Sequence, residues 1–343
     1  MENKNLETTL NKINIYYNEN KEDFDNNIIK TNLDEIDNSF VRNGLEKRGI
    51  YAIAGKTGSG KTTLLRHITL ANVENNNISA FFNLEESERK FYNCLLAKES
   101  KVALHKLKEN NLDDFEQIQL IAANKHIKSM KDNLIVKSSD FIKLSDLIKS
   151  ILEIKIKSGL DLVAINSLQN VLLENGVIPN KEEDFTFIID TLNLVSKSLN
   201  IAIIFDIQTN KKHQLEKDIV PPMENSKDLG KLDEFLAGLF VVSYNWNRDN
   251  IANLIKYNEM EVTIAKNRFG STGKKNIIID PNTGTIYNKK ATKKIASIDV
   301  YVDENMDEKA ISLLEVISSA VENRYYKNGD VRFELNNLSD NKQ

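Results

Sequence analysis

An eight-residue run in the first quarter of the chain constrains its fold more than any other feature. It reads Gly55-Lys56-Thr57-Gly58-Ser59-Gly60-Lys61-Thr62, which matches the pattern GxxxxGK[ST]. The apolar run Ile50 to Ala54 precedes it, and the helix-forming segment Thr62 to Ala71 follows it. A glycine-rich turn between a strand and a helix directs backbone N–H groups at a polyphosphate. The run therefore predicts a strand, a phosphate-binding loop and a helix.

Each residue type in this loop has a physical reason to be there. The glycines allow the backbone to approach the phosphates, Lys61 supplies positive charge for the β- and γ-phosphates, and the Thr62 hydroxyl is a ligand suited to Mg²⁺. The bland alternative is a glycine-rich turn that matches by chance. We predict that the polyphosphate is held by Gly55, Lys56, Thr57, Gly58, Ser59, Gly60, Lys61, Thr62 and Thr63.

Composition narrows the class of protein. The chain has 343 residues, 41% of them hydrophobic, which is enough to bury one large α/β core with extensions. Its net charge of −4 gives no overall attraction to nucleic acid, so such contacts must come from local basic loops. Cys94 is the only cysteine, which excludes a disulfide framework. No run of about 18 apolar residues occurs, so we predict a cytoplasmic protein without a signal peptide or membrane span.

Apolar runs typical of buried strands alternate with segments of helical periodicity. The expected strands after the first are Ile78 to Leu84, Leu134 to Val136, Leu162 to Ile165, Ile201 to Phe205 and Leu239 to Val242. The expected helices between them are Glu88 to Ala97, Asp114 to Ile127, Leu144 to Ile154 and Phe185 to Leu199. This alternation predicts an α/β fold with a mostly parallel sheet flanked by helices. A C-terminal β-hairpin is expected from Val262 to Ala265 and Ile277 to Ile279, on either side of the glycine-containing stretch Phe269 to Lys275.

The carboxyl ends of the strands are the next place to look, because ligands of open α/β sheets bind there. The strand ending at Leu84 is followed by Glu85, a candidate general base that polarises water for attack on a γ-phosphate. Glu86 follows at once. In the alternative reading, both acids are helix N-terminal residues favoured by the helix dipole.

A metal site is predicted at two further strand ends. Asn166 stands where most enzymes of this broad class place the acid that orients Mg²⁺, and an amide oxygen lacks the charge that holds a hard cation. Asp206 ends the strand expected to lie between the phosphate-loop strand and the one ending at Asn166. We therefore predict Thr62, Asn166 and Asp206 as the metal site, with Asp206 supplying the missing charge. Alternatively, Asp206 only caps its strand and faces water.

Several ordered segments resemble the C-terminal ATPase domain of the DnaB-like replicative helicases. They are AFFNLEES (Ala80 to Ser87), LDLVAINSLQ (Leu160 to Gln169), SLNIAIIFDIQTNKK (Ser198 to Lys212), ENSKDLG (Glu224 to Gly230) and EVTIAKNRFGSTG (Glu261 to Gly273). The family segments read FFSLEMS, LDLIVIDYLQ, a stretch ending in SQLNR, SDLRESG and IIIGKQRNGPTG. The resemblance covers about residues 28 to 288. It implies a RecA-like P-loop NTPase core that binds ATP and Mg²⁺.

The resemblance also implies roles for individual residues. Glu85 corresponds to the catalytic glutamate and Gln208 to the sensor of the γ-phosphate. Lys266 and Arg268 correspond to a basic finger that reaches the neighbouring subunit's nucleotide site. Two residues apart on an expected strand, these cations project from one face, and a cation presented in trans stabilises the charge that develops during phosphoryl transfer. The alternative is a basic, solvated hairpin.

DNA binding is expected from a long irregular segment, Thr209 to Lys231. The corresponding family loop lines a central channel and holds single-stranded DNA. The match implies contacts by Lys211, Lys227, Asp228 and Gly230. A mixed-charge loop that only solvates the surface is the alternative.

Three parts of the chain follow from these patterns. Residues 1–27 form an N-terminal helical segment, whose stripe Leu6, Leu10, Ile13 and Tyr17 packs either on its own core or, as a linking helix, on an adjacent subunit. Residues 28–288 form the ATPase core. Residues 289–343 form an extension, read either as a small appended fold with a helix near Ala310 to Val321 and a strand at Val331 to Leu335, or as a loosely ordered tail.

The function implied by the resemblance is a ring-forming ATP hydrolase, expected as a homo-hexamer, that couples ATP hydrolysis to translocation on single-stranded DNA and to duplex unwinding in DNA replication. A primase, loader or polymerase is the candidate partner. Because of Asn166, two alternatives stay open. One is an ATP-dependent DNA-binding or loading module with weak hydrolysis, and the other is a regulator that uses nucleotide only to hold a ring together.

Overall fold

The computed structural model describes residues 27–173, 175–208, 232–244, 259–288, 296–302 and 331–337. The chain divides into two compact units, Met1–Ile286 and Tyr287–Gln343. The N-terminal stripe, the predicted DNA-binding segment and the helix near Ala310 lie outside the described residues. The three-part division of the chain stays a prediction.

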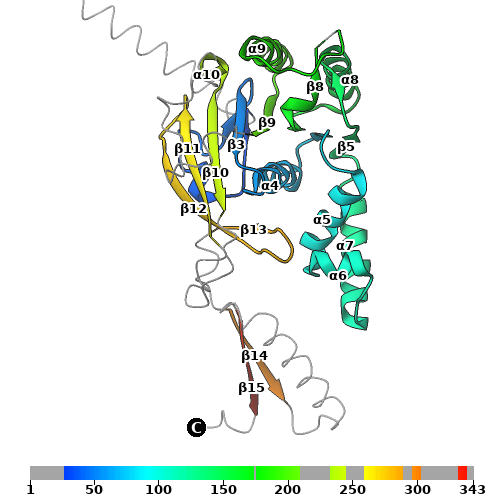
Figure 1. Cartoon of the computed structure of the whole chain (residues 1–343). Coiled ribbons are helices and arrows are strands. Elements are labelled where there is room, and N and C mark those ends of the chain that lie inside the picture. The colour runs from blue at the N-terminus through cyan, green and yellow to red at the C-terminus, as the bar shows by residue number, and fades with distance from the viewer. Residues whose placement is uncertain are drawn as a thin grey trace, which may run out of the picture. The chain divides into compact units, whose positions relative to one another are not determined.

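A nine-stranded sheet forms the centre of the first unit, in the order β13-β12-β11-β10-β3-β9-β7-β4-β5 (Figure 1). Its strands are β3 (Ile50–Gly55), β4 (Ser79–Asn83), β5 (Leu134–Ser138), β7 (Leu162–Asn166), β9 (Ala202–Gln208), β10 (Gly238–Tyr244), β11 (Glu259–Asn267), β12 (Gly273–Ile279) and β13 (Ile286–Tyr287). All neighbouring pairs from β10 to β5 are parallel, whereas β11 pairs antiparallel with β10 and β12. The predicted α/β class, the mostly parallel sheet and the hairpin are confirmed, as is the position of β9 between β3 and β7.

Helices cover both faces of this sheet. They are α4 (Lys61–Glu74), α5 (Glu88–Ser100), α6 (Leu104–Glu109), α7 (Asp114–Ser129), α8 (Leu144–Ser158) and α9 (Glu182–Leu199), with the single turns α3 (Asp34–Asp37) and α10 (Leu232–Phe235). Figure 1 shows α5, α6 and α7 grouped together at one side. Among the described residues, no helix has the length and apolar character needed to cross a bilayer.

The core has two layers because successive side chains of a strand point to opposite faces. Tyr51 and Ile53 of β3 belong to the apolar cluster that includes α4 and α5. Ile50, Ala52 and Ala54 belong to the cluster that includes α8 and α9. All of these residues are buried, which explains why β3 reads as a continuous apolar run rather than an alternating one.

Short elements were not predicted from the sequence. They include the pair β1 (Ile28–Ile29) and β2 (Leu45–Glu46), the pair β6 (Ile142–Lys143) and β8 (Val171–Leu172), and the 3₁₀ turn η1 (Leu168–Asn170). Strands of two residues carry no periodicity that a sequence pattern can reveal. The pair β6–β8 joins the segments that follow β5 and β7, whereas the pair β1–β2 lies on the stretch before β3.

The second unit contains two described strands. β14 (Ala296–Val302) pairs in parallel with β15 (Val331–Asn337). A strand at Val331 to Leu335 was one of the two expectations for this region, whereas β14 was not predicted. Whether this region is a small appended fold or a loosely ordered tail stays a prediction.

Candidate nucleotide-binding and catalytic site

The loop between β3 and α4 has the backbone geometry of a phosphate-binding loop. Gly58 and Gly60 have φ angles of 78° and 93°, which residues with side chains rarely adopt. A Cβ on Gly55 would lie 2.5 Å from Ser59 Oγ and 2.7 Å from Val242 O, so the packing excludes a larger residue there. Within the described residues, the buried Ser59 Oγ has no hydrogen-bond partner. A buried, unsatisfied hydroxyl just before a helix fits a contact with a bound anion.

Lys61 opens α4 and lies over this loop. Its Nζ donates to Lys56 O at 2.9 Å. Burial lowers the pKa of Lys61, and the negative charges of Asp206 and Glu85 oppose that shift. Lys61 and the two carboxylates therefore share one electrostatic environment in front of the loop, as expected for groups that surround a charged ligand.

Gln208, the last residue of β9, also contacts the loop. Its Nε2 donates to Thr57 Oγ1. Gln169 Nε2 donates to Gln208 O at 3.4 Å, and Ser167 Oγ donates to Gln169 Oε1 at 2.8 Å. Gln208 is thus joined to the phosphate loop on one side and to the end of β7 on the other, immediately before the predicted DNA-binding segment.

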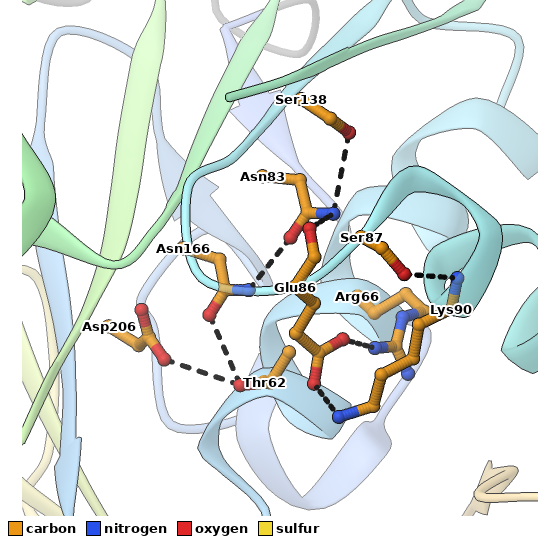
Figure 2. A network of polar contacts seen from close by, with 9 residues as sticks. All are labelled: Thr62, Arg66, Asn83, Glu86, Ser87, Lys90, Ser138, Asn166 and Asp206. Atoms are coloured by element: carbon orange, nitrogen blue, oxygen red, sulfur yellow. Dashed lines mark hydrogen bonds and ion pairs between the residues drawn. The ribbon is translucent and has the colours of Figure 1, made fainter. Parts of the chain in front are cut away.

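Polar residues occupy matching positions at the carboxyl ends of adjacent strands, as Figure 2 shows. Asn83 at the end of β4 is paired in register with Ser138 of β5 and with Asn166 of β7. Asn83 Nδ2 lies 3.4 Å from Ser138 Oγ, and Asn166 Nδ2 donates to Asn83 Oδ1 at 3.1 Å. Asp206 of β9 follows in the same row, because the residues before it and before Asn166 are paired. The parallel register therefore builds a polar row across four strands.

Two residues of this row, Asn166 and Asp206, contact the first turn of α4. Thr62 Oγ1 lies 3.2 Å from Asn166 Oδ1 and 3.4 Å from Asp206 Oδ2 (Figure 2). Burial raises the pKa of the Asp206 carboxyl to about 7; Glu85 acts in the same direction, and Lys61 opposes it. The structure thus brings together the three residues predicted for the metal site, and a hydroxyl, an amide oxygen and a carboxylate fit a hard cation such as Mg²⁺.

The Asn166 carboxamide fits this place in two orientations. In one, its nitrogen donates to Asn83 Oδ1 and its oxygen faces the Asp206 carboxylate, an arrangement that is repulsive unless a proton or cation lies between the two oxygens. In the other, its nitrogen donates to the two Asp206 oxygens at 3.3 and 3.1 Å. Because Asn166 contacts the carboxylate directly, the negative charge absent from position 166 is present one strand away.

The two acids after β4 differ in their contacts. Glu86 forms ion pairs with Arg66 at 3.2 Å and with Lys90 at 2.7 Å (Figure 2). Glu85 is exposed, and within the described residues it forms no ion pair. Neither acid lies in the helix, because α5 begins at Glu88 and Ser87 caps it by accepting from Lys90 N. Glu85 is therefore the acid left available to a ligand at the loop.

The tip of the basic hairpin, with Lys266 and Arg268, lies at the opposite end of the strands from the phosphate loop of its own chain. Gly238 at the start of β10 pairs both with Tyr51 near the start of β3 and with Asn267 at the end of β11. The phosphate loop begins at the other end of β3, four residues and about 13 Å further along the strand. Lys266 and Arg268 are therefore placed away from the site of their own chain.

Arg268 departs from one expectation. β11 ends at Asn267, so Arg268 lies in the turn rather than on the strand. Its backbone N donates to Ala237 O at 2.8 Å and its guanidinium to Glu234 O. The geometric reason given for a shared face with Lys266 is therefore wrong.

The hairpin tip is held by a distant segment of the same chain. Val41 N donates to Phe269 O at 2.8 Å, and Ser271 N donates to Ser39 O at 2.8 Å. A Cβ on Gly270 would lie 1.9 Å from Ser39 O, so only glycine allows this approach. The tip is fixed rather than free.

The sequence patterns missed Asn83 and Asn170, whose carboxamides bind the backbone around Glu85. Asn83 is the last residue of β4, so the rule that singled out Asn166 applies to it equally. Asn170 gave no such signal, because the 3₁₀ turn that carries it was not predicted. The predicted DNA contacts Lys211, Lys227, Asp228 and Gly230 lie outside the described residues.

Comparison with known proteins gives a consistent set of similarities. The model of the DnaB-like helicase C terminal domain family matches residues 29–288. The chain is 26% identical over 246 residues to the replicative DNA helicase DnaB of Mycoplasma genitalium, covering 68% of this chain and 51% of that protein. It is 24% identical over 280 residues to a probable plasmid replicative DNA helicase of Chlamydia muridarum, covering 81% and 58%. The chain spans about half the length of the first curated relatives it matches.

Solved structures agree in fold. An ATPase domain of known structure superposes with a TM-score of 0.70 at 19% identity, covering 81% of this chain and 98% of that one. A DnaB-like replicative helicase, described together with its interactions with primase, superposes with a TM-score of 0.69 at 18% identity, covering 81% and 66%. These similarities confirm the RecA-like core. Since the family model matches more than half of the chain, this protein belongs to the DnaB-like helicase C-terminal domain family.

Proposed function

We propose that this chain is the motor of a ring-forming DNA helicase, which couples ATP hydrolysis to translocation on single-stranded DNA and to duplex unwinding in replication. The family match supports this function. The observation that carries it is the convergence of Lys61, Thr62, Asp206 and Glu85 at the phosphate loop, since a cation, a metal-binding hydroxyl and two carboxyl groups are what a nucleoside triphosphatase needs there.

Each residue has a role in this proposal. The loop from Gly55 to Thr63 holds ATP, and Lys61 offsets the charge of its terminal phosphates. Thr62, Asn166 and Asp206 hold Mg²⁺, which when bound neutralises phosphate charge. Glu85 accepts a proton from the attacking water, and Gln208 leaves Thr57 to contact the γ-phosphate.

Assembly follows from the position of the hairpin. The fixed tip with Lys266 and Arg268 lies at the end of the strands opposite the phosphate loop. The tip therefore contributes to hydrolysis only in trans, at the site of the next subunit. Such head-to-tail contacts close into a ring, which we propose to be a hexamer. The segment with Lys211, Lys227, Asp228 and Gly230 then lines the channel and follows the DNA backbone. A primase, loader or polymerase is the proposed replication partner.

The test compares the wild type with Lys61→Ala in fork unwinding and in ATP hydrolysis with and without single-stranded DNA. We expect DNA-stimulated hydrolysis and unwinding in the wild type and neither in the variant. Nucleotide-dependent DNA binding without hydrolysis would instead favour a loading module, which the neutral Asn166 makes the second candidate. Nucleotide-dependent rings that are indifferent to DNA would favour a regulator.

Subunit mixing tests the proposed trans contact. Lys61→Ala and Arg268→Ala should each abolish hydrolysis, because each removes one half of every site. In a random equal mixture, about a quarter of the boundaries pair an intact loop with an intact tip, so part of the activity should return. A mixture as inactive as its components would contradict a shared site.

A further inference from the structure

Asn170 makes an unusual pair of contacts beside the proposed catalytic acid. It is the last residue of η1, shortly after β7. Its single Nδ2 donates to Leu84 O at 2.7 Å and to Asp140 O at 2.8 Å. Both acceptors are backbone carbonyls, so the orientation of the carboxamide is settled, because an oxygen in the same place would face two other oxygens. Asn170 therefore ties the segment after β4 to the segment after β5.

The backbone on both sides of Glu85 is held by asparagines. Leu84, the residue before it, is bound at its carbonyl by Asn170 and donates its N–H to Asn166 O at 2.5 Å. Glu86, the residue after it, accepts at its carbonyl from Asn83 Nδ2 at 2.6 Å. The turn that carries Glu85 is thus fixed at its backbone by the side chains of Asn83 and Asn170 and by the carbonyl of Asn166 at the end of β7.

The side chain of Glu85 has no comparable anchor in the described residues. Glu86 is fixed through its carboxylate by Arg66 and Lys90, whereas Glu85 is exposed and forms no ion pair there. The region that the Glu85 carboxylate reaches is therefore set by the backbone that carries it. A general base must lie within hydrogen-bond reach of its water, and a displacement of about 1 Å costs on the order of 100-fold in rate.

We infer that Asn170 is a positioning residue for Glu85. Its two hydrogen bonds hold the turn so that the carboxylate faces the phosphate loop, and Asn170 itself touches neither nucleotide nor metal. Its loss should therefore slow the chemical step and leave nucleotide binding intact. This inference rests on the proposed function, in which Glu85 activates water.

The experiment uses the full chain with Asn170→Ala and Asn170→Asp. The Asp variant keeps the size of the side chain, removes both donors and places a carboxylate against two carbonyls. We expect single-turnover ATP hydrolysis to fall about 10- to 100-fold in both variants. The dissociation constant of a fluorescent ATP analogue should change less than about twofold, because the loop is untouched. The matched control is Asn175→Ala in the following loop. Asn175 is exposed, and its side chain accepts from Val177 N at 3.1 Å. The hydrolysis rate of this control variant should equal that of the wild type.

A double-mutant comparison separates positioning from general structural damage. In a Glu85→Gln background the base is gone, so adding Asn170→Ala should leave the residual rate unchanged. The inference is overturned if either Asn170 variant hydrolyses ATP like the wild type, if nucleotide binding weakens as much as hydrolysis, or if Asn170→Ala lowers the Glu85→Gln rate by the same factor as the wild-type rate.

Failure of the proposed function gives a different result. Equal hydrolysis by the wild type and Lys61→Ala would reject the ATPase assignment and the role of Asn170 with it. Normal wild-type hydrolysis that depends on Lys61 and Glu85 but not on Asn170 would reject the positioning role alone.

Discussion

Replacing Asp206 by Asn tests whether a carboxylate on β9 does the work expected of an acid at position 166. Asp206 Oδ2 lies 3.4 Å from Thr62 Oγ1, and the Asn166 amide nitrogen, when turned toward it, lies 3.1 Å from the same oxygen. Two unit charges about 4 Å apart interact with about 4 kcal/mol at an effective dielectric constant near 20, and a divalent ion doubles this before desolvation is subtracted. A net loss of about 3 kcal/mol would raise the Mg²⁺ requirement about 100-fold.

The assay is a titration of Mg²⁺ against ATP hydrolysis at pH 8, where a carboxyl with a pKa of about 7 is mostly ionised before the ion binds. We expect the half-saturating Mg²⁺ concentration to rise about 100-fold in Asp206→Asn. The exchanged variant, Asp206→Asn with Asn166→Asp, should recover most of the loss, because the side chain at position 166 reaches to 3.1 Å from the Asp206 carboxylate. An unchanged Mg²⁺ titration in Asp206→Asn would refute this reasoning.

Three further predictions concern catalysis and stability. Glu85→Gln should lower the rate of ATP hydrolysis at least about 100-fold, whereas Glu86→Gln should lower the melting temperature with a smaller effect on the rate. Equal losses of rate in the two variants would contradict the assignment of catalysis to Glu85 and of a structural role to Glu86. Burial raises the pKa of Asp37 from 3.8 to about 6, so its ionisation favours the unfolded state and stability is lost as the pH rises from about 4 to 6. Asp37→Asn should remove up to about 3 kcal/mol of that loss, measured as the difference in unfolding free energy between pH 4 and pH 7 in urea. The same pH dependence in the variant and the wild type would contradict this reasoning. Gly270→Ala places a Cβ 1.9 Å from Ser39 O and should lower the unfolding free energy by about 1–3 kcal/mol, and an unchanged melting temperature would show that the tip is not held as described.

The sequence was most informative where one short motif fixes local geometry. The glycines of the phosphate loop and the apolar run before it predicted β3, the loop and α4 closely, because that turn has few conformations open to other residues. The order of β3, β9 and β7 was also predicted. The placement of Asp206 beside Asn166 then followed from parallel pairing.

Contacts between distant segments were harder to predict. The hydrogen bond between Asn166 and Asn83 depends on the register of β4 and β7, which no local pattern specifies. Arg268 was expected on a strand, but β11 ends one residue earlier, at Asn267. The side chain of Asn267 donates to the carbonyl of Ser39, which is 228 residues away in the sequence, and no local pattern predicts such a contact. Asn170 acts through a turn of three residues, too short to leave a periodic signal.

The docking of the hairpin tip on Ser39 and Val41 has a mechanical consequence. Ser39 and Val41 come before β2 and β3, on the stretch of chain that leads into the phosphate loop. In the proposed ring, a pull on the tip by the occupied pocket of the next subunit would be passed through this contact toward the pocket of the subunit that owns the tip. Because such coupling between two binding events is reciprocal, nucleotide binding in each pocket would change the nucleotide affinity of the next pocket around the ring.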